Sequence, residues 1–150
     1  MSTISTAYDT LITDLGTLFP NHKRMSNPYA VDQNASRILE QAWGLAVGPA
    51  LNTNLELQCS YSVQRTLRIT LSRKYYAVEN DPAQKAVTEK LLLEDHNTLV
   101  NYFTADATLA ANVMKVDYVS DGGIEFVFAD KDQYLYISTD FSMDYKEPIT

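Results

Sequence analysis

Two histidines and several acidic residues are the side chains of this 150-residue sequence that could support catalysis or metal binding. His96 follows Glu94 and Asp95, but adjacent helical residues point in different directions, so the triplet lacks the i, i+4 spacing that places two ligands on one face. His96 also falls between Leu92 and Leu99 on an apolar helical stripe. We therefore expect it to be a partly buried structural histidine.

The other candidate motifs do not predict an enzyme. His22 lies in a polar segment beside two cationic residues, where we expect a solvated side chain. The run Asp130-Lys131-Asp132 resembles the opening of a calcium-binding loop, but Leu135 and Phe141 stand where that loop requires Gly and Glu. The sequence contains no phosphate-binding Gly-rich loop and no nucleophilic serine motif. We predict a protein without catalytic residues, cofactor or bound metal.

Basic and aromatic residues are concentrated in one short segment of the chain. Arg and Tyr are favoured at the centres of protein interfaces, where planar donors and rigid rings give large contact areas. Two alternatives stay open: an edge strand that its charges protect from aggregation, and a nucleic-acid-binding groove. The residues that we predict as an oligomer interface are Arg65, Arg68, Arg73, Lys74, Tyr75 and Tyr76.

These residues lie in or just after a run, Leu55 to Leu71, that alternates strictly between two kinds of position. The odd positions are apolar except Arg65, and the even positions are polar, which is typical of a half-buried β-strand. At ~3.3 Å per residue the run would extend about 55 Å, whereas a domain of this size has a radius of gyration of ~15 Å. We therefore expect the ribbon either to fold back at a bulge or to project onto a neighbouring subunit.

The remaining pattern predicts an α+β domain, residues 1–150, with a largely antiparallel sheet, a long β-ribbon and two main helices packed on one face. The helices that we expect run from Ile4 to Phe19, from Asn34 to Trp43 and for about twenty residues after Asp81-Pro82. The further strands that we expect are Leu45–Val47 and a three-stranded meander over 113–119, 124–128 and 134–145. Residues 21–32 are expected to form a polar loop.

Composition limits the possible functions. The net charge of −7 argues against a general nucleic-acid binder, because phosphate contacts require Lys and Arg. A hydrophobic content of 45% argues against a disordered chain. No signal peptide or membrane segment is expected. The single cysteine, Cys59, falls on the apolar face of the ribbon and is interpreted as a core residue.

The order of these elements resembles the tail terminator (tail-completion) proteins of tailed bacteriophages and related neck proteins. The segments that carry the resemblance are Asn27-Pro28-Tyr29, Trp43-Gly44-Leu45-Ala46-Val47-Gly48-Pro49-Ala50, Arg73-Lys74-Tyr75-Tyr76 and Phe141-Ser142-Met143-Asp144-Tyr145. The resemblance implies a virion structural protein, assembled in the host cytoplasm, that forms a homo-oligomeric ring, commonly a hexamer. Such a ring caps the head-proximal end of the tail tube and stops its polymerisation.

The same resemblance implies the partners. They are other copies of the chain, the tail tube protein and a head-completion or connector protein, while DNA passes through the lumen without specific binding and no membrane is involved. Another neck, head-closure or tube subunit is an alternative within the same class. A small acidic binding module, such as an immunity protein that neutralises a basic partner, is the alternative from a different class.

Overall fold

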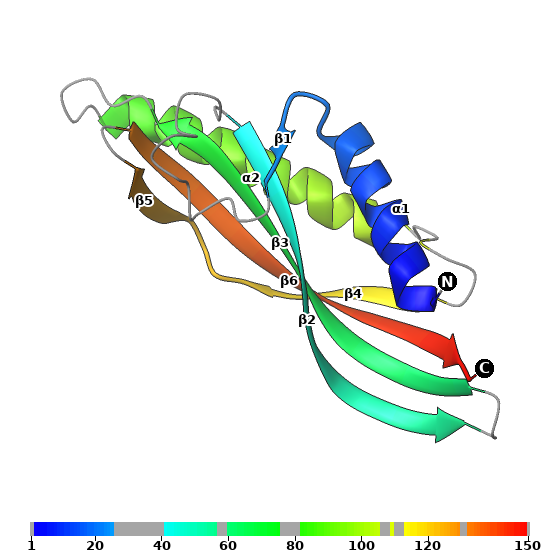
Figure 1. Ribbon diagram of the computed structural model, residues 1–150. Coiled ribbons are helices and arrows are strands. Elements are labelled where there is room, and N and C mark those ends of the chain that lie inside the picture. Colours follow the sequence, from blue (N-terminus) through cyan, green and yellow to red (C-terminus); the bar gives the residue numbers. More distant parts are fainter. Residues whose placement is uncertain are drawn as a thin grey trace.

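The protein folds into two helices and an extended, strongly twisted sheet, seen in a computed structural model that describes residues 2–25, 41–56, 60–75, 82–105, 109, 113–129 and 132–149 (Figure 1). This arrangement confirms the predicted α+β class. The helices of the described part are α1 (Thr3–Leu18) and α2 (Pro82–Thr104). Its strands are β1 (Lys23–Arg24), β2 (Gln41–Glu56), β3 (Ser60–Tyr75), β4 (Val113–Asp121), β5 (Glu125–Ala129) and β6 (Asp132–Pro148).

The sheet has the strand order β1-β2-β3-β6-β4, and β5 also pairs with β6. All pairs are antiparallel except the short contact of β1 with β2. The predicted ribbon folds back within its length, because Leu55 and Glu56 end β2 whereas β3 begins at Ser60, directly opposite Glu56. Cys59 lies outside the described residues. The run that looked like one long strand therefore supplies the end of β2 and most of β3.

The apolar face of β3 is covered within its own chain. Val63, Leu67, Ile69 and Leu71 are all buried and belong to a single core cluster. The helices contribute Ala7, Leu11 and Leu15 from α1 and Leu92, Leu99 and Phe103 from α2, and β6 contributes Leu135, Ile137, Phe141, Met143 and Tyr145. The expectation that this face requires a neighbouring subunit is therefore wrong for β3.

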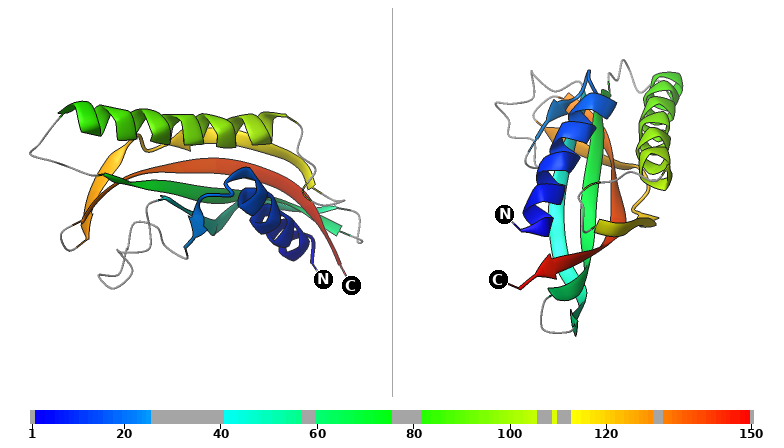
Figure 2. Two further views of the ribbon diagram at one scale, coloured as in Figure 1. Left: turned by 90° about the horizontal axis from the view of Figure 1, so that it is seen from above. Right: turned by 90° about the vertical axis from the view of Figure 1, so that its right-hand side faces the viewer.

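Both helices pack on the same face of the sheet, as the sequence predicts. The ring of Phe103 in α2 lies 4.4 Å from the ring of Phe141 in β6. Farther along β6, Glu147 accepts hydrogen bonds from the first amides of α1. Phe141 and Glu147 are an even number of residues apart in a strand with regular pairing, so they share a face. Because the sheet twists, the helices lie along different parts of that face (Figure 2).

The first turn of α1 is capped by one local and one distant side chain. The side chain of Ser2 caps α1 by accepting a hydrogen bond from the amide of Ser5. The buried carboxylate of Glu147 accepts from the amide of Thr3 at 2.5 Å and from that of Ile4 at 3.3 Å. A negative charge at this end also complements the helix dipole. The predicted second long helix is confirmed as α2, which begins at Pro82.

The segment before the ribbon differs from the prediction. Ala42 and Trp43, expected in a short helix, lie in β2, and the expected Leu45–Val47 strand is a part of that longer strand. The expected cap Asn34 lies outside the described residues. Part of the expected polar loop forms β1, whose Arg24 lies over the Trp43 ring at 5.8 Å. Parallel pairing with β2 thus replaces the expected loop at Lys23 and Arg24, and residues 26–32 of that loop lie outside the described residues.

The carboxyl-terminal meander is right in one pairing and wrong in the other. β5 and β6 form the expected hairpin, but β4 pairs with β6 and not with β5. β4 and β5 follow one another along β6, so they act as one interrupted strand. The interruption includes Gly122 and Gly123, and Gly123 has a φ of 73°, which favours glycine. The amide of Gly122 still donates to the carbonyl of Ser138, so the two strands stay aligned along β6.

Candidate functional site

The predicted interface residues divide into an inward and an outward group. Arg73 lies on the helix-covered face and binds Asp95 of α2, and Tyr75 is buried. Arg65 donates to the hydroxyl of Tyr145 and to the carbonyl of Gly48. These side chains are committed to their own subunit.

The outward group lies on the face that the helices leave uncovered. Arg68 pairs there with Asp140 of β6 at 2.8 Å, with half of its side chain exposed. Lys74 is partly exposed, and Tyr76 lies outside the described residues. An interface over all six residues stays a prediction. Arg68 is the one of them whose described side chain offers the most surface to a partner.

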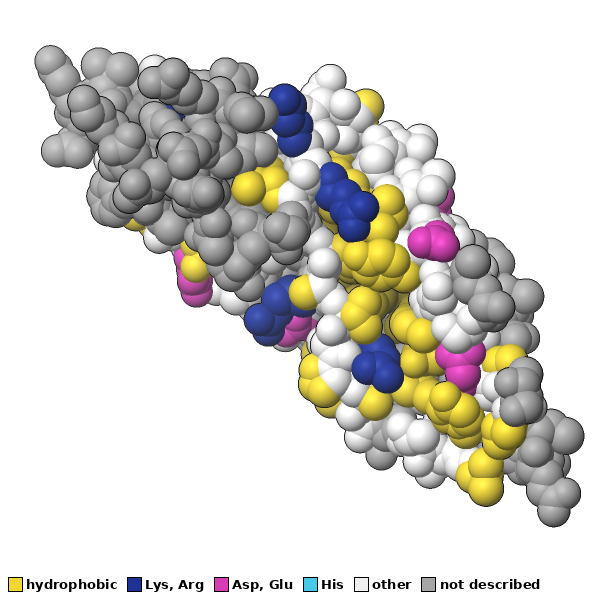
Figure 3. Space-filling model, viewed as in Figure 1, with side chains coloured by type: hydrophobic (Ala, Val, Ile, Leu, Met, Phe, Trp, Pro, Cys, Tyr) yellow, Lys and Arg dark blue, Asp and Glu magenta, His cyan; other side chains and the backbone are white. Residues whose placement is uncertain are grey.

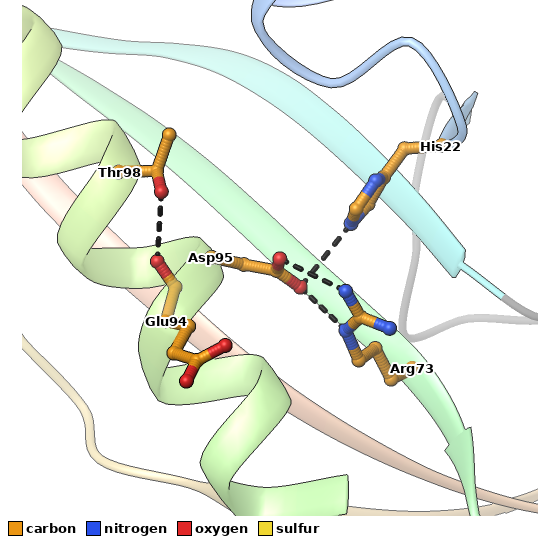
Figure 4. A network of polar contacts seen from close by, with 5 residues as sticks. All are labelled: His22, Arg73, Glu94, Asp95 and Thr98. Carbon is orange, nitrogen blue, oxygen red and sulfur yellow. Dashed lines mark hydrogen bonds and ion pairs between the residues drawn. The ribbon is translucent and has the colours of Figure 1, made fainter.

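A buried ionic network joins three elements of the fold (Figure 4). The guanidinium of Arg73 in β3 donates to both carboxylate oxygens of Asp95 in α2, at 2.6 and 3.0 Å. The Nε2 atom of His22, just after α1, lies 3.3 Å from the same carboxylate. His22 packs against the ring of Phe19, and its side chain is only 5% exposed. The expectation of a solvated His22 is therefore wrong, since β1 and the end of α1 bring it inward.

The electrostatics of this network favour a charged Asp95. Burial alone would raise the pKa of this carboxyl, but hydrogen bonds and charges from His22 and Arg73 outweigh it, so the pKa lies below its ordinary value. A cavity of about 190 Å³ adjoins the network and is also lined by Gln41 and Thr98. The neighbouring Glu94 points away from Asp95 in Figure 4, as expected for adjacent helical residues. The arrangement ties the α1–β1 connection to the sheet and to α2.

His96 is partly buried, as the sequence predicts. Its Nδ1 atom lies 2.9 Å from the hydroxyl of Thr139, and its Nε2 atom lies 3.6 Å from a carboxylate oxygen of Asp121. The ring also makes an edge contact with Tyr118. Because Asp121 also accepts from the amide of Gly123, the histidine supports the end of β4 beside the strand interruption.

A second hollow of about 400 Å³ lies over the uncovered face at the interruption between β4 and β5. Its lining includes the Arg68–Asp140 pair, the Gly122-Gly123 turn and Tyr136, whose hydroxyl donates to Glu125. The charged groups of this lining thus have partners within the chain. No group of metal-ligating side chains is close enough to hold an ion among the residues that the structure describes.

The outer part of β2 presents the most exposed apolar side chains of the sheet. Leu55 is 73% exposed, Leu51 is 58% exposed and Val47 is also exposed. β1 pairs with β2 only at Ala42 and Trp43, so no described strand covers its edge beyond that point. Figure 3 shows hydrophobic side chains reaching the lower right of the visible face, the end at which β2 and β3 meet. This surface is a candidate for contact with another chain.

Comparisons with known proteins identify no family. No protein-family model matches the sequence, and no curated protein is significantly similar to it. Within the described residues, neither helix has the length and apolar character needed to cross a membrane.

Sequence reasoning missed the exposed outer part of β2 and the ionic network around Asp95. Gly44, Gly48 and Pro49 look like chain breaks, which hid the continuous strand β2. The structure accommodates them through irregular register between Val47 and Asn52. The ionic network joins residues from three elements, and no local spacing connects them. A signal was available in Arg73, which continues the odd, otherwise mostly apolar positions of the ribbon as Arg65 does.

Proposed function

We propose that this protein is a virion structural subunit that closes into a homo-oligomeric ring at the head-proximal end of a phage tail tube. In that position the ring ends tube polymerisation and gives the head connector a docking surface, while DNA passes through its lumen. The resemblance of the sequence to tail terminator and neck proteins supports this function. The observation that carries the assembly itself is the exposed outer part of β2.

The outer part of β2 has the properties of an assembly surface. An uncovered strand edge presents unpaired backbone groups that can pair with another chain. Natural edge strands are usually protected from pairing with other chains. In β2, the irregular register around Pro49 protects the middle of the strand in this way. From Asn52 to Glu56, however, β2 is regularly paired with β3 on one side, and Leu55 is highly exposed. This stretch is therefore the part of the edge best suited to contact a neighbour.

The shape of the sheet is compatible with a ring. Beyond the short β1 contact, the described edges of the sheet are β2 on one side and β4 on the other, and these two strands differ in sequence. Contacts between unlike surfaces of identical subunits close into rings when the rotation between subunits permits. The net charge of −7 would keep such a ring from holding the phosphates of passing DNA.

Light scattering coupled to size-exclusion chromatography tests this proposal. We expect a defined species near six times the chain mass of 16.9 kDa, and rings in electron micrographs of the same fractions. A monomer at every protein concentration would contradict the proposal. Tight one-to-one binding of such a monomer to a basic enzyme would instead support the immunity-type alternative.

A further inference from the structure

The cavity beside the Asp95 network lies where four parts of the fold meet: the α1–β1 connection, the start of β2, the end of β3 and α2. Its described lining has an apolar wall, made by Leu18, Phe19 and Pro20, and polar side chains that include Gln41 and Thr98. A volume of about 190 Å³ is large enough for a small organic ion, since a water molecule in the liquid occupies only about 30 Å³.

Arg73 lines this cavity and has a second edge that can bind a carboxylate. Asp95 accepts from Nε and Nη2, which form one edge of the guanidinium. The other edge, formed by Nη1 and the remaining hydrogen of Nη2, has no acceptor among the described residues, and Figure 4 shows Nη1 turned away from Asp95. Two parallel N–H groups of this kind match the two oxygens of a carboxylate.

Gln41 adds donors next to this edge of Arg73. The two residues are directly paired between β2 and β3, so their side chains are close neighbours on the same face of the sheet. Both line the cavity. The side-chain amide of Gln41 can donate two hydrogen bonds. The cavity therefore combines N–H donors from two adjacent strands with a small apolar wall, an arrangement suited to an anion that carries a short apolar group.

The charges around the cavity allow one further anion when His22 is protonated. Arg73 and a protonated His22 carry two positive charges, whereas Asp95 carries one negative charge. Asp95 is the one acidic residue of the described lining, and Glu94 on the same helix points away from it (Figure 4). The described lining from β2 is the uncharged Gln41. Because the side chain of His22 is only 5% exposed, a bound anion would offset the remaining positive charge better than water does.

We infer that this cavity binds a small carboxylate through the second edge of Arg73 and the amide of Gln41, and that binding is coupled to proton uptake by His22. The apolar wall receives the short carbon chain of the ligand. This site goes beyond the proposed ring and does not depend on it, so the two proposals can fail separately.

Isothermal titration calorimetry of the full-length protein with propionate tests the site. We expect one propionate per chain with a dissociation constant of about 1 mM, a value reasonable for so small a ligand. Propionamide has the same shape without the charge and should bind at least about tenfold more weakly. Propionate affinity should rise at least about fivefold from about pH 8 to about pH 5.5, where histidines take up protons. The variant H22Q keeps an N–H donor for Asp95 and should lose this pH dependence.

Three variants test the residues that hold the ligand. R73K keeps the positive charge but lacks the paired donors, and should abolish measurable binding. Q41L alters a residue outside the Asp95 network, so it should keep the fold, and it should weaken propionate binding about tenfold. R68K is the matched control, because Arg68 binds Asp140 through the same two nitrogens but lies on the opposite face of β3. R68K should bind propionate like the original protein, and circular dichroism checks the fold of all three.

A free acid and the end of another polypeptide present the same carboxylate. A tripeptide with a free carboxyl terminus distinguishes these sources in the same titration. Tighter binding of the tripeptide than of propionate would assign the site to a chain terminus, and weaker binding would assign it to a free small acid.

Three results would overturn the inference. They are the absence of saturable propionate binding, equal affinity for propionamide, and unchanged affinity in a folded Q41L variant. An affinity that does not change with pH in the original protein would refute the coupling to His22. A protein that forms rings but does not bind propionate would leave the proposed ring intact, whereas a monomer that binds propionate would refute the ring alone.

Discussion

The two ends of the β2–β3 hairpin differ sharply although one alternating sequence runs through both. At the inner end, Leu71 pairs with Trp43, and both are buried beneath the helices. At the outer end, Leu55 pairs with the partly buried Tyr61 but is itself largely exposed. Alternation therefore fixes which face a residue occupies. Whether that face is covered depends on where the helices end.

The largest expected effect separates these two ends directly. Leu67→Asp places a carboxylate in the core and should destabilise the fold by more than about 4 kcal/mol, enough to unfold many domains of this size. In the dissociated subunit, Leu55→Asp should change the free energy of unfolding by less than about 0.5 kcal/mol, because the site is exposed there. Urea denaturation followed by circular dichroism measures both. An L67D variant with the stability of the original protein would show that Leu67 does not lie in the core.

A second contrast compares the buried ion pair with the exposed one. Asp95→Asn leaves Arg73 and His22 without their anionic partner and should cost about 2–3 kcal/mol of stability. Asp140→Asn removes the exposed partner of Arg68 and should cost less than about 1 kcal/mol. Thermal and urea unfolding of the two variants give the comparison. Equal losses would mean that burial does not strengthen the Asp95 network.

The Asp95 network also predicts a pH dependence. The pKa of Asp95 is lowered in the folded protein, so its charged form stabilises the fold at all pH values above the ordinary carboxyl range. This stabilisation is lost as pH falls through the lowered pKa, below about pH 4. The stability difference between the original protein and D95N should thus shrink below about pH 4. A difference that persists unchanged at about pH 2 would contradict this assignment.

A third comparison concerns the end of α1. Glu147→Gln removes the negative charge that accepts from the amides of Thr3 and Ile4, and should cost about 1 kcal/mol. Amide hydrogen exchange should accelerate in the first turn of α1 more than elsewhere. Glu89→Gln, which alters an exposed pair with Lys85, is the matched control and should leave α1 unchanged. Equal exchange in both variants would argue against a capping role.

Much of the fold could be predicted, because its helices carry local signals. The stripe through Leu11 and Leu15 and the Pro82 start identified α1 and α2 correctly. The pairing of β4 and β5 could not be predicted, because a Gly122-Gly123 turn usually indicates a hairpin between the strands that it joins. Here it interrupts one strand against β6.

The candidate site was less predictable than the fold. The environment of His22 depends on Asp95, which is 73 residues away in sequence. The exposure of Leu55 depends on how far the helices extend over the hairpin. Neither is encoded in local periodicity, since both follow from packing between distant elements. The inward position of Arg73 was hidden for the same reason, because spacing alone does not reveal its partner Asp95.

The position of β6 has a consequence for how the subunit is made. This strand is the last of the described elements to leave the ribosome, yet it lies inside the sheet and pairs with β3, β4 and β5. A nascent chain that stops before Asp132 has a β3 with one unpaired edge and an α1 without the Glu147 carboxylate. Closure of the sheet therefore waits until Asp132–Pro148 has been synthesised, although every other described strand has by then already left the ribosome.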